Sequence, residues 1–245
     1  MKYSQIALAL AFTGALASAD TLGVYVSAGQ WNAAYSGDIQ NGADQVNIES
    51  DLGLSDDNQN TYSIAFEHPV PLLPNLKLRH QDLQTNGSSV LSRSFTYGNT
   101  TFSVSDTVTS DFDLSHDDYI LYYEILDNWV SLDVGLNVKK FNGDVRIETT
   151  QNSESDTLDD SIPLLYARAN FEFPLTGLSL DVEASGATFS GDSFIDMQAA
   201  LRYETDALFY AELGYRRISL NANDVSGINV DLAIDGAFLN FGLHF

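Results

Sequence analysis

The sequence predicts an all-β fold, specifically a transmembrane, antiparallel, up-and-down β-barrel of ten strands. Two observations predict this fold. Apolar and polar residues alternate in ten separate segments, and the connections between these segments alternate strictly between short and long. A period of two indicates strands with two different faces. Connections sorted by length are typical of barrels that cross a membrane with short turns at one end and longer loops at the other.

Each of the ten segments has one apolar and one polar face. In the clearest segment, residues 130–138, Val or Leu occupies every second position and Ser, Asp, Gly and Asn occupy the positions between. Successive side chains of a strand point to opposite faces, so this pattern separates the two classes of residue. The expected strands are residues 22–31, 62–68, 76–81, 119–125, 130–138, 165–173, 178–184, 195–203, 209–216 and 237–245.

The connections alternate in length along the chain. Four are tight turns rich in Pro, Gly, Asn and Asp, residues that favour turns. Five are longer and polar, and the longest is expected to carry its own hairpin at Gly98-Asn99. Both chain ends then lie at the short-turn end of the barrel. The expected turns are 69–74, 126–128, 174–177 and 205–207, and the expected loops are 36–60, 86–115, 142–160, 187–193 and 221–228.

A soluble β-sandwich is the alternative fold, because its strands also alternate. Its turn lengths have no reason to sort by end, and its core does not accept the unpaired charges that lie mid-strand here. Aromatic residues also gather near the strand ends, as in the two interfacial girdles of a membrane barrel. The expected girdle residues are Trp129, Phe173, Tyr203, Phe209 and Phe245 near the turns and Trp31, Tyr62, Tyr119, Phe141, Phe189 and Tyr215 near the loops.

Residues 1–19 have the order of a secretory signal peptide. Lys2 precedes an apolar stretch at 6–16, and Ala17-Ser18-Ala19 supplies the small residues of a cleavage site. The apolar stretch is shorter than the roughly 20 residues of a membrane-spanning helix. We therefore expect an exported chain in which residues 20–245 form a single barrel domain. The sequence has no cysteine, so disulfides do not stabilise it.

The carboxy-terminal segment, DGAFLNFGLHF, has a wholly apolar face that ends on Phe245. It resembles the last strand of Gram-negative outer-membrane barrels, by which the barrel assembly machinery recognises them. In that family the final Phe and the alternating apolar positions before it are the recognised features. They map onto Leu239, Phe241, Leu243 and Phe245. The resemblance, to small and mostly uncharacterised barrels, implies a place in the cell outer membrane and supplies no activity.

The polar faces of the strands are expected to line the barrel interior, where they carry many charges. Acids and bases are mixed there, so neighbouring strands bring opposite charges together. A ten-stranded barrel is only a little wider than the eight-stranded kind, whose side chains just fill the interior. We expect a largely closed lumen, with a narrow, cation-preferring pore as the alternative. The expected lumen charge network is Glu67, Lys77, Arg79, Glu124, Asp133, Lys139, Arg168, Glu172, Asp181, Glu183, Asp196, Arg202, Glu204, Glu212 and Arg216.

The chain has a net charge of -23, and much of its acid lies in the expected loops. Residues 36–60 hold six acids and no Lys or Arg, and residues 142–160 hold six acids and one base, Arg146. Outward-facing carboxylates would meet lipopolysaccharide phosphates, and divalent cations, which prefer oxygen ligands, would bridge the two. The alternative is a solvated acidic surface suited to a salty medium. Nucleic-acid binding is disfavoured, because phosphate contacts need basic patches.

Histidine and aspartate residues near the loop end raise the alternative of a surface hydrolase. His80 and Asp82 lie at the end of the third expected strand, and His116, Asp117 and Asp118 precede the fourth. If these residues converged, they could activate a water molecule by general-base catalysis. The paired pattern of ten-stranded outer-membrane proteases is incomplete, because no second such pair appears on the opposite wall. We expect a nonenzymatic barrel with no catalytic residues, no cofactor and no resident metal ion.

Overall fold

A computed structural model describes residues 22–70, 72–225 and 228–245, so the expected signal peptide lies outside the described residues. These residues form seventeen strands. None of their segments is a helix long and apolar enough to cross a membrane. The strands are β1 (Gly23–Gln40), β2 (Val46–Asn47), β3 (Asp57–Glu67), β4 (Asn75–Gln81), β5 (Gln84–Val90), β6 (Phe95–Tyr97), β7 (Thr100–Phe102), β8 (Thr107–Asp113), β9 (His116–Asp127), β10 (Val130–Phe141), β11 (Gly143–Glu148), β12 (Ser153–Leu158), β13 (Ser161–Phe173), β14 (Leu178–Phe189), β15 (Asp192–Glu204), β16 (Phe209–Val225) and β17 (Ile228–His244).

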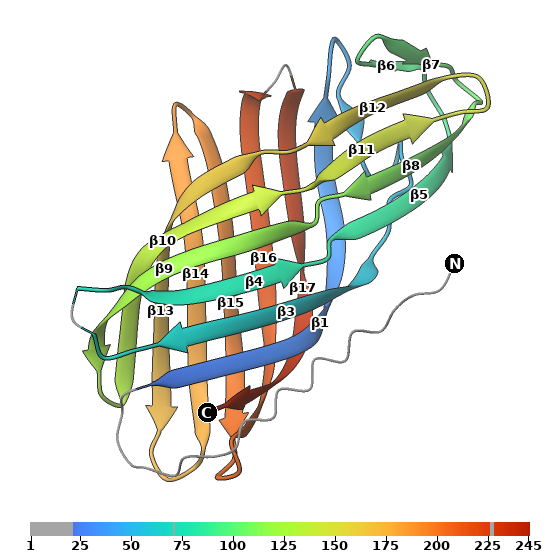
Figure 1. Cartoon of the computed structure of the whole chain (residues 1–245). Coiled ribbons are helices and arrows are strands. Elements are labelled where there is room, and N and C mark those ends of the chain that lie inside the picture. The colour runs from blue at the N-terminus through green and yellow to red at the C-terminus, as the bar shows by residue number, and fades with distance from the viewer. Residues whose placement is uncertain (1–21, 71, 226–227) are drawn as a thin grey trace, which may run out of the picture.

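Ten of the strands form one closed antiparallel sheet, which confirms the predicted ten-stranded barrel. Each strand pairs with the next one of the ring, and β1 closes the ring by pairing with β17. Figure 1 shows the ring as two walls of strands, with the carboxy terminus near its lower end. The order around the ring is β1, β3, β4, β9, β10, β13, β14, β15, β16 and β17.

The last residue of the chain takes part in closing the ring. The Val24 N–H donates to Phe245 O, and the Phe245 N–H donates to Val24 O, each at 2.9 Å. Pairing of β1 with β17 continues as far as Gln40 and Asn229. Backbone groups in hydrocarbon have no water to bond, so they must bond one another. Closure of the ring therefore removes the open edges that lipid would not tolerate.

Four neighbouring barrel strands continue beyond the ring as a second sheet. β4 continues into β5 and β10 into β11, while β8 leads into β9 and β12 into β13, each after a break of one or two residues. The second sheet has the order β12-β11-β8-β5, which matches β13-β10-β9-β4 below it. Figure 1 shows it projecting from one wall of the barrel, with the β6–β7 hairpin above it. We call β5, β8, β11 and β12 the projecting sheet.

The short connections lie where the sequence predicts them, but the long ones are more ordered than predicted. The hairpin predicted at Gly98-Asn99 is present as β6–β7, and Gly98 adopts a positive φ of 59° in its turn. Most of 86–115 and 142–160 belongs to the projecting sheet or this hairpin. The loop predicted at 36–60 shortens to 41–56, because β1 and β3 extend into it.

The loops predicted at 187–193 and 221–228 are wrong. β14 and β15 pair as far as Phe189 and Asp192, so only a tight turn joins them. β16 and β17 likewise extend to Val225 and Ile228. Polar residues on the strand ends resembled a loop, although backbone pairing continues through them. Such residues are compatible with a strand that has left the hydrocarbon and entered water.

The two faces of the strands exchange character at one level of the barrel. Below this level the outward side chains are apolar and exposed, as for Leu136 at 57% and Leu213 at 64%. Above it the outward positions are polar and the inward ones apolar, as at Asn32 and Trp31. Hydrocarbon selects the first arrangement and water the second, so the exchange marks the extracellular membrane boundary. Outward polar residues at this level include Gln30, Asn60, His80, Asp117, Lys140 and Arg217.

Most of the predicted girdle aromatics are exposed, but two are not. Trp31 is only 1% exposed and lies inside the barrel, where its Nε1 donates to Gly236 O at 3.2 Å. Phe141 packs in the interior, with its ring centre 6.2 Å from that of Phe194. The girdle prediction is therefore wrong for Trp31 and Phe141. Both lie above the boundary, where the inward face is the apolar one.

We expect Leu243→Asp combined with Phe245→Asp to deplete folded barrel from outer-membrane fractions. Leu243 lies on the apolar, outward face of β17, and Phe245 directly follows this strand at the seam with β1, where a carboxylate would meet lipid. Loss of heat-modifiable mobility in gel electrophoresis measures the effect. Asn221→Asp, an outward substitution above the boundary, is the control and should leave mobility unchanged. Normal mobility of the double variant would contradict a lipid-facing role for this seam.

Candidate functional site

The barrel interior holds three groups of ion pairs between the membrane boundary and the short turns. The group nearest the boundary, which we call the upper cluster, centres on a fully buried lysine. Lys139 Nζ lies 2.7 Å from Asp118 Oδ1 and 3.0 Å from Asp196 Oδ2. Buried charges are tolerated when they are paired in this way. The upper cluster comprises Lys77, Arg79, Asp118, Lys139, Glu183, Asp196 and Arg216.

Several contacts of the upper cluster cross the lumen instead of following the wall. Arg79 on β4 lies 2.7 Å from Glu183 on β14, although β9, β10 and β13 separate these strands in the ring. Lys77 reaches the same carboxylate at 2.5 Å. Arg216 on β16 donates to Gln81 on β4 at 2.7 Å. These contacts tie opposite walls together, so side chains fill the lumen at this level.

The middle group lies closer to the short turns and contains more acid than base. Arg168 Nε lies 2.7 Å from Asp181 Oδ2, and its NH1 lies 3.6 Å from Asp133 Oδ2. Glu67 forms no ion pair with any base of the described residues and instead accepts a hydrogen bond from the Tyr122 hydroxyl at 2.7 Å. Arg168 is therefore the single base that neutralises two carboxylates in this group.

The third group lies at the short-turn end and is built around Arg202. Its guanidinium lies 3.7 Å from the ring centre of Tyr210, a distance suited to a cation–π contact. Glu204 lies 3.0 Å away on one side and Glu212 lies 3.9 Å away on the other. His244 also contacts Glu204 at 2.8 Å, so the end of β17 joins this group.

The structure places every base of the predicted lumen network in an ion pair, but two predicted acids besides Glu67 stand apart. Glu124 and Glu172 are exposed near the short-turn ends of β9 and β13, and no ion pair reaches them within the described ranges. Asp118, expected at the rim, instead lies buried in the upper cluster. The alternation of β9, extended by one residue before Tyr119, would have placed it inside.

An apolar plug fills the barrel above the upper cluster. It combines inward side chains of strands that have passed the boundary with side chains of the 41–56 loop. Arg216 joins the plug to the upper cluster, because its guanidinium lies 5.0 Å from the ring centre of Trp31. Plug residues that are at most 5% exposed include Trp31, Tyr35, Ile48, Leu52, Leu54, Leu83, Leu164, Phe194, Ile218 and Ile234.

The plug is not among the features predicted from the sequence, although β1 carries a signal of it. The inward positions of this strand change from Ser27 and Gly29 to Trp31, Ala33 and Tyr35. That change from small or polar residues to apolar ones marks the level at which the interior becomes a core.

A small polar cavity remains beneath the plug. Its volume is about 70 Å³, and Ser27, Lys77, Arg168 and Tyr210 are among its lining residues. This space exceeds the roughly 10–15 Å³ that one water molecule needs, so the cavity accommodates water. The interior is therefore hydrated locally and crowded elsewhere.

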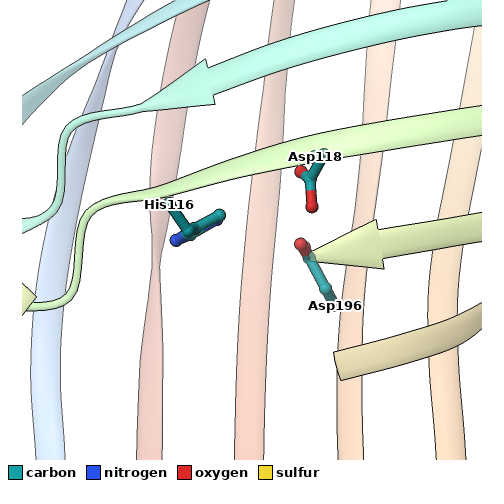
Figure 2. Close-up of side chains that lie close together, drawn as sticks. All are labelled: His116, Asp118 and Asp196. Carbon is teal, nitrogen blue, oxygen red and sulfur yellow. The ribbon is translucent and has the colours of Figure 1, made fainter. Parts of the chain in front are cut away.

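His116, Asp118 and Asp196 form a compact buried set of possible metal ligands, shown in Figure 2. Their donor atoms all lie within 4.8 Å of one another. His116 Nδ1 is 2.9 Å from Leu114 O, which holds the ring in place. Imidazole and carboxylate are suitable metal ligands, but the Lys139 ammonium already contacts both carboxylates. We therefore assign this set to the upper cluster, where the ammonium supplies the positive charge.

The candidate hydrolase residues divide between the two faces of the wall. His80 points outward, with Nδ1 2.7 Å from Asp117 Oδ1 and Nε2 3.2 Å from Asp82 Oδ1. His116 and Asp118 point inward and are buried. The two histidines therefore do not converge on one water molecule, and the grouping that the alternative of a surface hydrolase requires is not formed.

No family model matches the chain, and no curated protein matches it. Solved structures do match. Ail, the attachment invasion locus protein of Yersinia pestis, matches over 92% of this chain and 100% of its own, at 12% identity and a TM-score of 0.38. The transport unit of the autotransporter AIDA-I from Escherichia coli matches over 96% of this chain and 93% of its own, at 8% identity and a TM-score of 0.40. The P. putida toluene transporter TodX matches over 93% of this chain and 90% of its own, at 8% identity and a TM-score of 0.28. Likeness at this level carries no functional argument.

The architecture itself assigns the class of protein. The ring is closed and antiparallel, it has an even number of strands, its turns are short at one end, and its outer surface carries an apolar band. Together these features define the barrels of the Gram-negative outer membrane. The chain is an outer-membrane β-barrel. Its interior, plug and projecting sheet are the parts from which a function can be argued.

We expect Arg168→Met to lower the free energy of unfolding by about 3 kcal/mol, the low end for a broken buried pair. The low end applies because the Arg168 side chain is 20% exposed and water reaches it. Urea unfolding in lipid vesicles, followed by tryptophan fluorescence, measures the loss. Adding Asp133→Asn and Asp181→Asn should recover most of it. Equal losses in the single and triple variants would attribute the effect to packing instead of stranded charge.

We expect Asp117→Asn to lower the pKa of His80, which lies at the boundary outside the hydrocarbon. Partial burial lowers this pKa, but hydrogen bonds to Asp117 and Asp82 outweigh burial and hold it above its usual value. The resulting stabilisation is complete below the unfolded pKa of about 6.5 and is lost as pH rises through the folded pKa. NMR titration of the imidazole protons in detergent micelles measures the change. A shift of equal size in the remote control Asp111→Asn would contradict this assignment.

Proposed function

We propose that this chain is a nonenzymatic, largely closed outer-membrane barrel that acts through the surface it presents outside the cell. The observation that carries the proposal is the obstructed interior. Ion pairs cross the lumen between β4 and β14, and the apolar plug lies above them. The cavity of about 70 Å³ beneath the plug is far smaller than a solute pathway through the barrel would require.

The surface above the membrane supports a role in contact with molecules outside the cell. The projecting sheet carries hydroxyl, amide and acidic side chains on its outward face, and Arg146 is the single base in its four strands. Asp159 and Asp160 extend the acidic character to the start of β13. Such a surface suits divalent cations that bridge to lipopolysaccharide phosphates, and it also suits an external partner with positive charge.

A narrow, cation-preferring pore is the second candidate, and the hydration of the lower interior favours it. The side chains of Lys77 and Arg168 are 17% and 20% exposed, so water reaches both. The middle group also contains more acid than base. Rearrangement of the upper cluster and the plug would then have to open the remaining path.

The carboxy-terminal strand is, in this proposal, the signal read by the barrel assembly machinery. Leu239, Phe241 and Phe245 present exposed side chains on the outward face of β17, and Leu243 lies between them. The same strand closes the ring against β1. Recognition of this strand and closure of the barrel would therefore use one segment of the chain.

We expect the folded chain to give no stepwise current in single-channel recordings across planar lipid bilayers. The contacts across the lumen and the plug above them are the physical reason. Heat-modifiable mobility verifies that the inserted sample is folded, and an open porin in the same lipid is the positive control.

Stable, stepwise, cation-selective conductance would overturn the closed-barrel proposal. Asp181→Asn combined with Glu183→Gln would then locate the constriction, since it removes two interior carboxylates. Asp111→Asn, on the outward face of the projecting sheet, is its matched control.

A further inference from the structure

One edge of the projecting sheet has no partner strand. β12 pairs with β11 on one side, and no strand pairs with its other side in the part of the chain that the structure describes. Figure 1 shows β12 as the outermost strand of this sheet. The opposite edge differs, because Leu54 of the 41–56 loop forms a β-bridge with Gly87 of β5. The sheet is thus covered at one edge and open at the other.

The β11–β12 hairpin determines which backbone groups face the open edge. The Thr149 N–H donates to Asn152 O at 2.7 Å, so these two residues form the hydrogen-bonded pair that closes the hairpin. Hydrogen-bonded and non-hydrogen-bonded pairs alternate along an antiparallel ladder. The residues whose N–H and C=O groups point away from β11 are therefore Ser153, Ser155 and Thr157.

Most of the usual protections of a strand edge are missing from β12. Proteins protect exposed edges with proline, lysine, β-bulges, covering segments or inward-pointing charges, and in the described part of the chain β12 has only the last of these. β12 contains no Pro or Lys, and its register with β11 is regular. Its two acids turn to the inner face, where Glu154 accepts from the Thr100 hydroxyl at 2.7 Å and Asp156 accepts from the Tyr97 hydroxyl at 2.8 Å. These bonds fix β12 against the β6–β7 hairpin and leave its edge accessible.

The charges around this edge favour one sign of partner. Asp159 and Asp160 follow β12, and Lys140 pairs with Asp159, so Asp160 is the unpaired acid of the two among the described residues. Asp144 and Glu148 lie on the neighbouring strand, where Arg146 is the one base. A second copy of this chain would bring acids against acids, which is unfavourable across paired strands. A segment rich in Lys or Arg is electrostatically complementary.

We propose that the open edge of β12 binds an extended, basic polypeptide segment as an added strand of the projecting sheet. The inference rests on the proposed function and names the surface and the chemical class of its external partner. Backbone hydrogen bonds to Ser153, Ser155 and Thr157 supply affinity, as in other cases of strand addition. Lys or Arg side chains of the partner supply the preference over neutral or acidic strands.

The test uses the full chain, folded in detergent micelles, and labelled synthetic peptides of alternating Val-Lys or Val-Glu sequence. Ser155→Pro removes the central N–H of the open edge and leaves the ladder with β11 intact, because Ser155 does not bond to β11. Ser155→Ala keeps this N–H and is the matched control. Fluorescence anisotropy at fixed ionic strength measures the dissociation constants.

We expect Val-Lys to bind the unaltered chain and Ser155→Ala with equal affinity, and Ser155→Pro about tenfold more weakly, because backbone bonds at the edge are lost. Val-Glu should not bind. Absence of Val-Lys binding, equal binding of both peptides, or equal affinity for the unaltered chain and Ser155→Pro would each overturn the proposal. The last outcome would indicate attraction to acidic surface without strand addition.

A second measurement covers the case in which Ser155→Pro fails to fold, as judged by heat-modifiable mobility. A Val-Lys peptide methylated at every backbone nitrogen keeps its charge but has no N–H to donate. It should bind the unaltered chain about tenfold more weakly than the parent peptide, and equal affinity would overturn strand addition. Conductance of the same sample is independent of this result. If the barrel conducts and still binds Val-Lys in preference to Val-Glu, only the closed lumen is refuted. If the barrel does not conduct and binds both peptides alike, only the strand addition at β12 is refuted.

Discussion

Lipid and water require opposite faces of the same strand, and this constraint organises the whole molecule. Within the membrane the outward side chains must be apolar and the interior accepts polar ones. Above the membrane the requirement reverses, because water surrounds the outer face and a core must form within. β1 passes both levels. Its outward positions change from Ala28 to Gln30, and its inward positions change from Ser27 to Trp31. The interior is therefore lined by ion pairs within the membrane and filled by the apolar plug above it.

The narrow ring explains why the interior charges bind one another. Side chains from opposite walls meet in a small barrel, so Arg79 and Lys77 reach Glu183 across the lumen. Charges in such a place are costly unless they are paired. The upper cluster has one more base than acid, and the middle group, with Glu67 counted, has two more acids than bases. The two groups border one cavity, so their excess charges compensate over a short distance.

Period-two patterns were sufficient to predict the ring, because membrane strands alternate between lipid and interior at every residue. The six bases that these patterns assign to the lumen all lie in ion pairs. The same patterns failed above the boundary. For Trp31 and Phe141 the sequence predicts contact with lipid, because the pattern is interpreted with the apolar face outward along the whole strand. Above the boundary the apolar face is the inward one. Asp118 was missed for a smaller reason, since the expected strand began one residue too late.

Long-range pairing was the other property that the sequence did not reveal. Residues 86–115 and 142–160 are polar and resemble loops in the sequence. Most of them nevertheless form strands that continue β4, β9, β10 and β13 in the same order. Each of their strands depends on a neighbour from a distant part of the chain. Contacts such as Tyr97 with Asp156 join segments whose separation in sequence gives no local signal.

The two edges of the projecting sheet differ, because a loop residue bridges to β5 and no described strand pairs with the outer side of β12. Its inner face is covered by the plug, the 41–56 loop and the β6–β7 hairpin, and its outer face is polar and suits water. At β5 the loop covers the edge through Leu54. At β12 the hairpin bonds to the inner-face carboxylates and stops short of the backbone edge. Covering segments are therefore available on both sides of the sheet, and one of them leaves the adjacent edge exposed. Since an open edge readily pairs with another chain, the accessible edge of β12 suits the binding of an added strand.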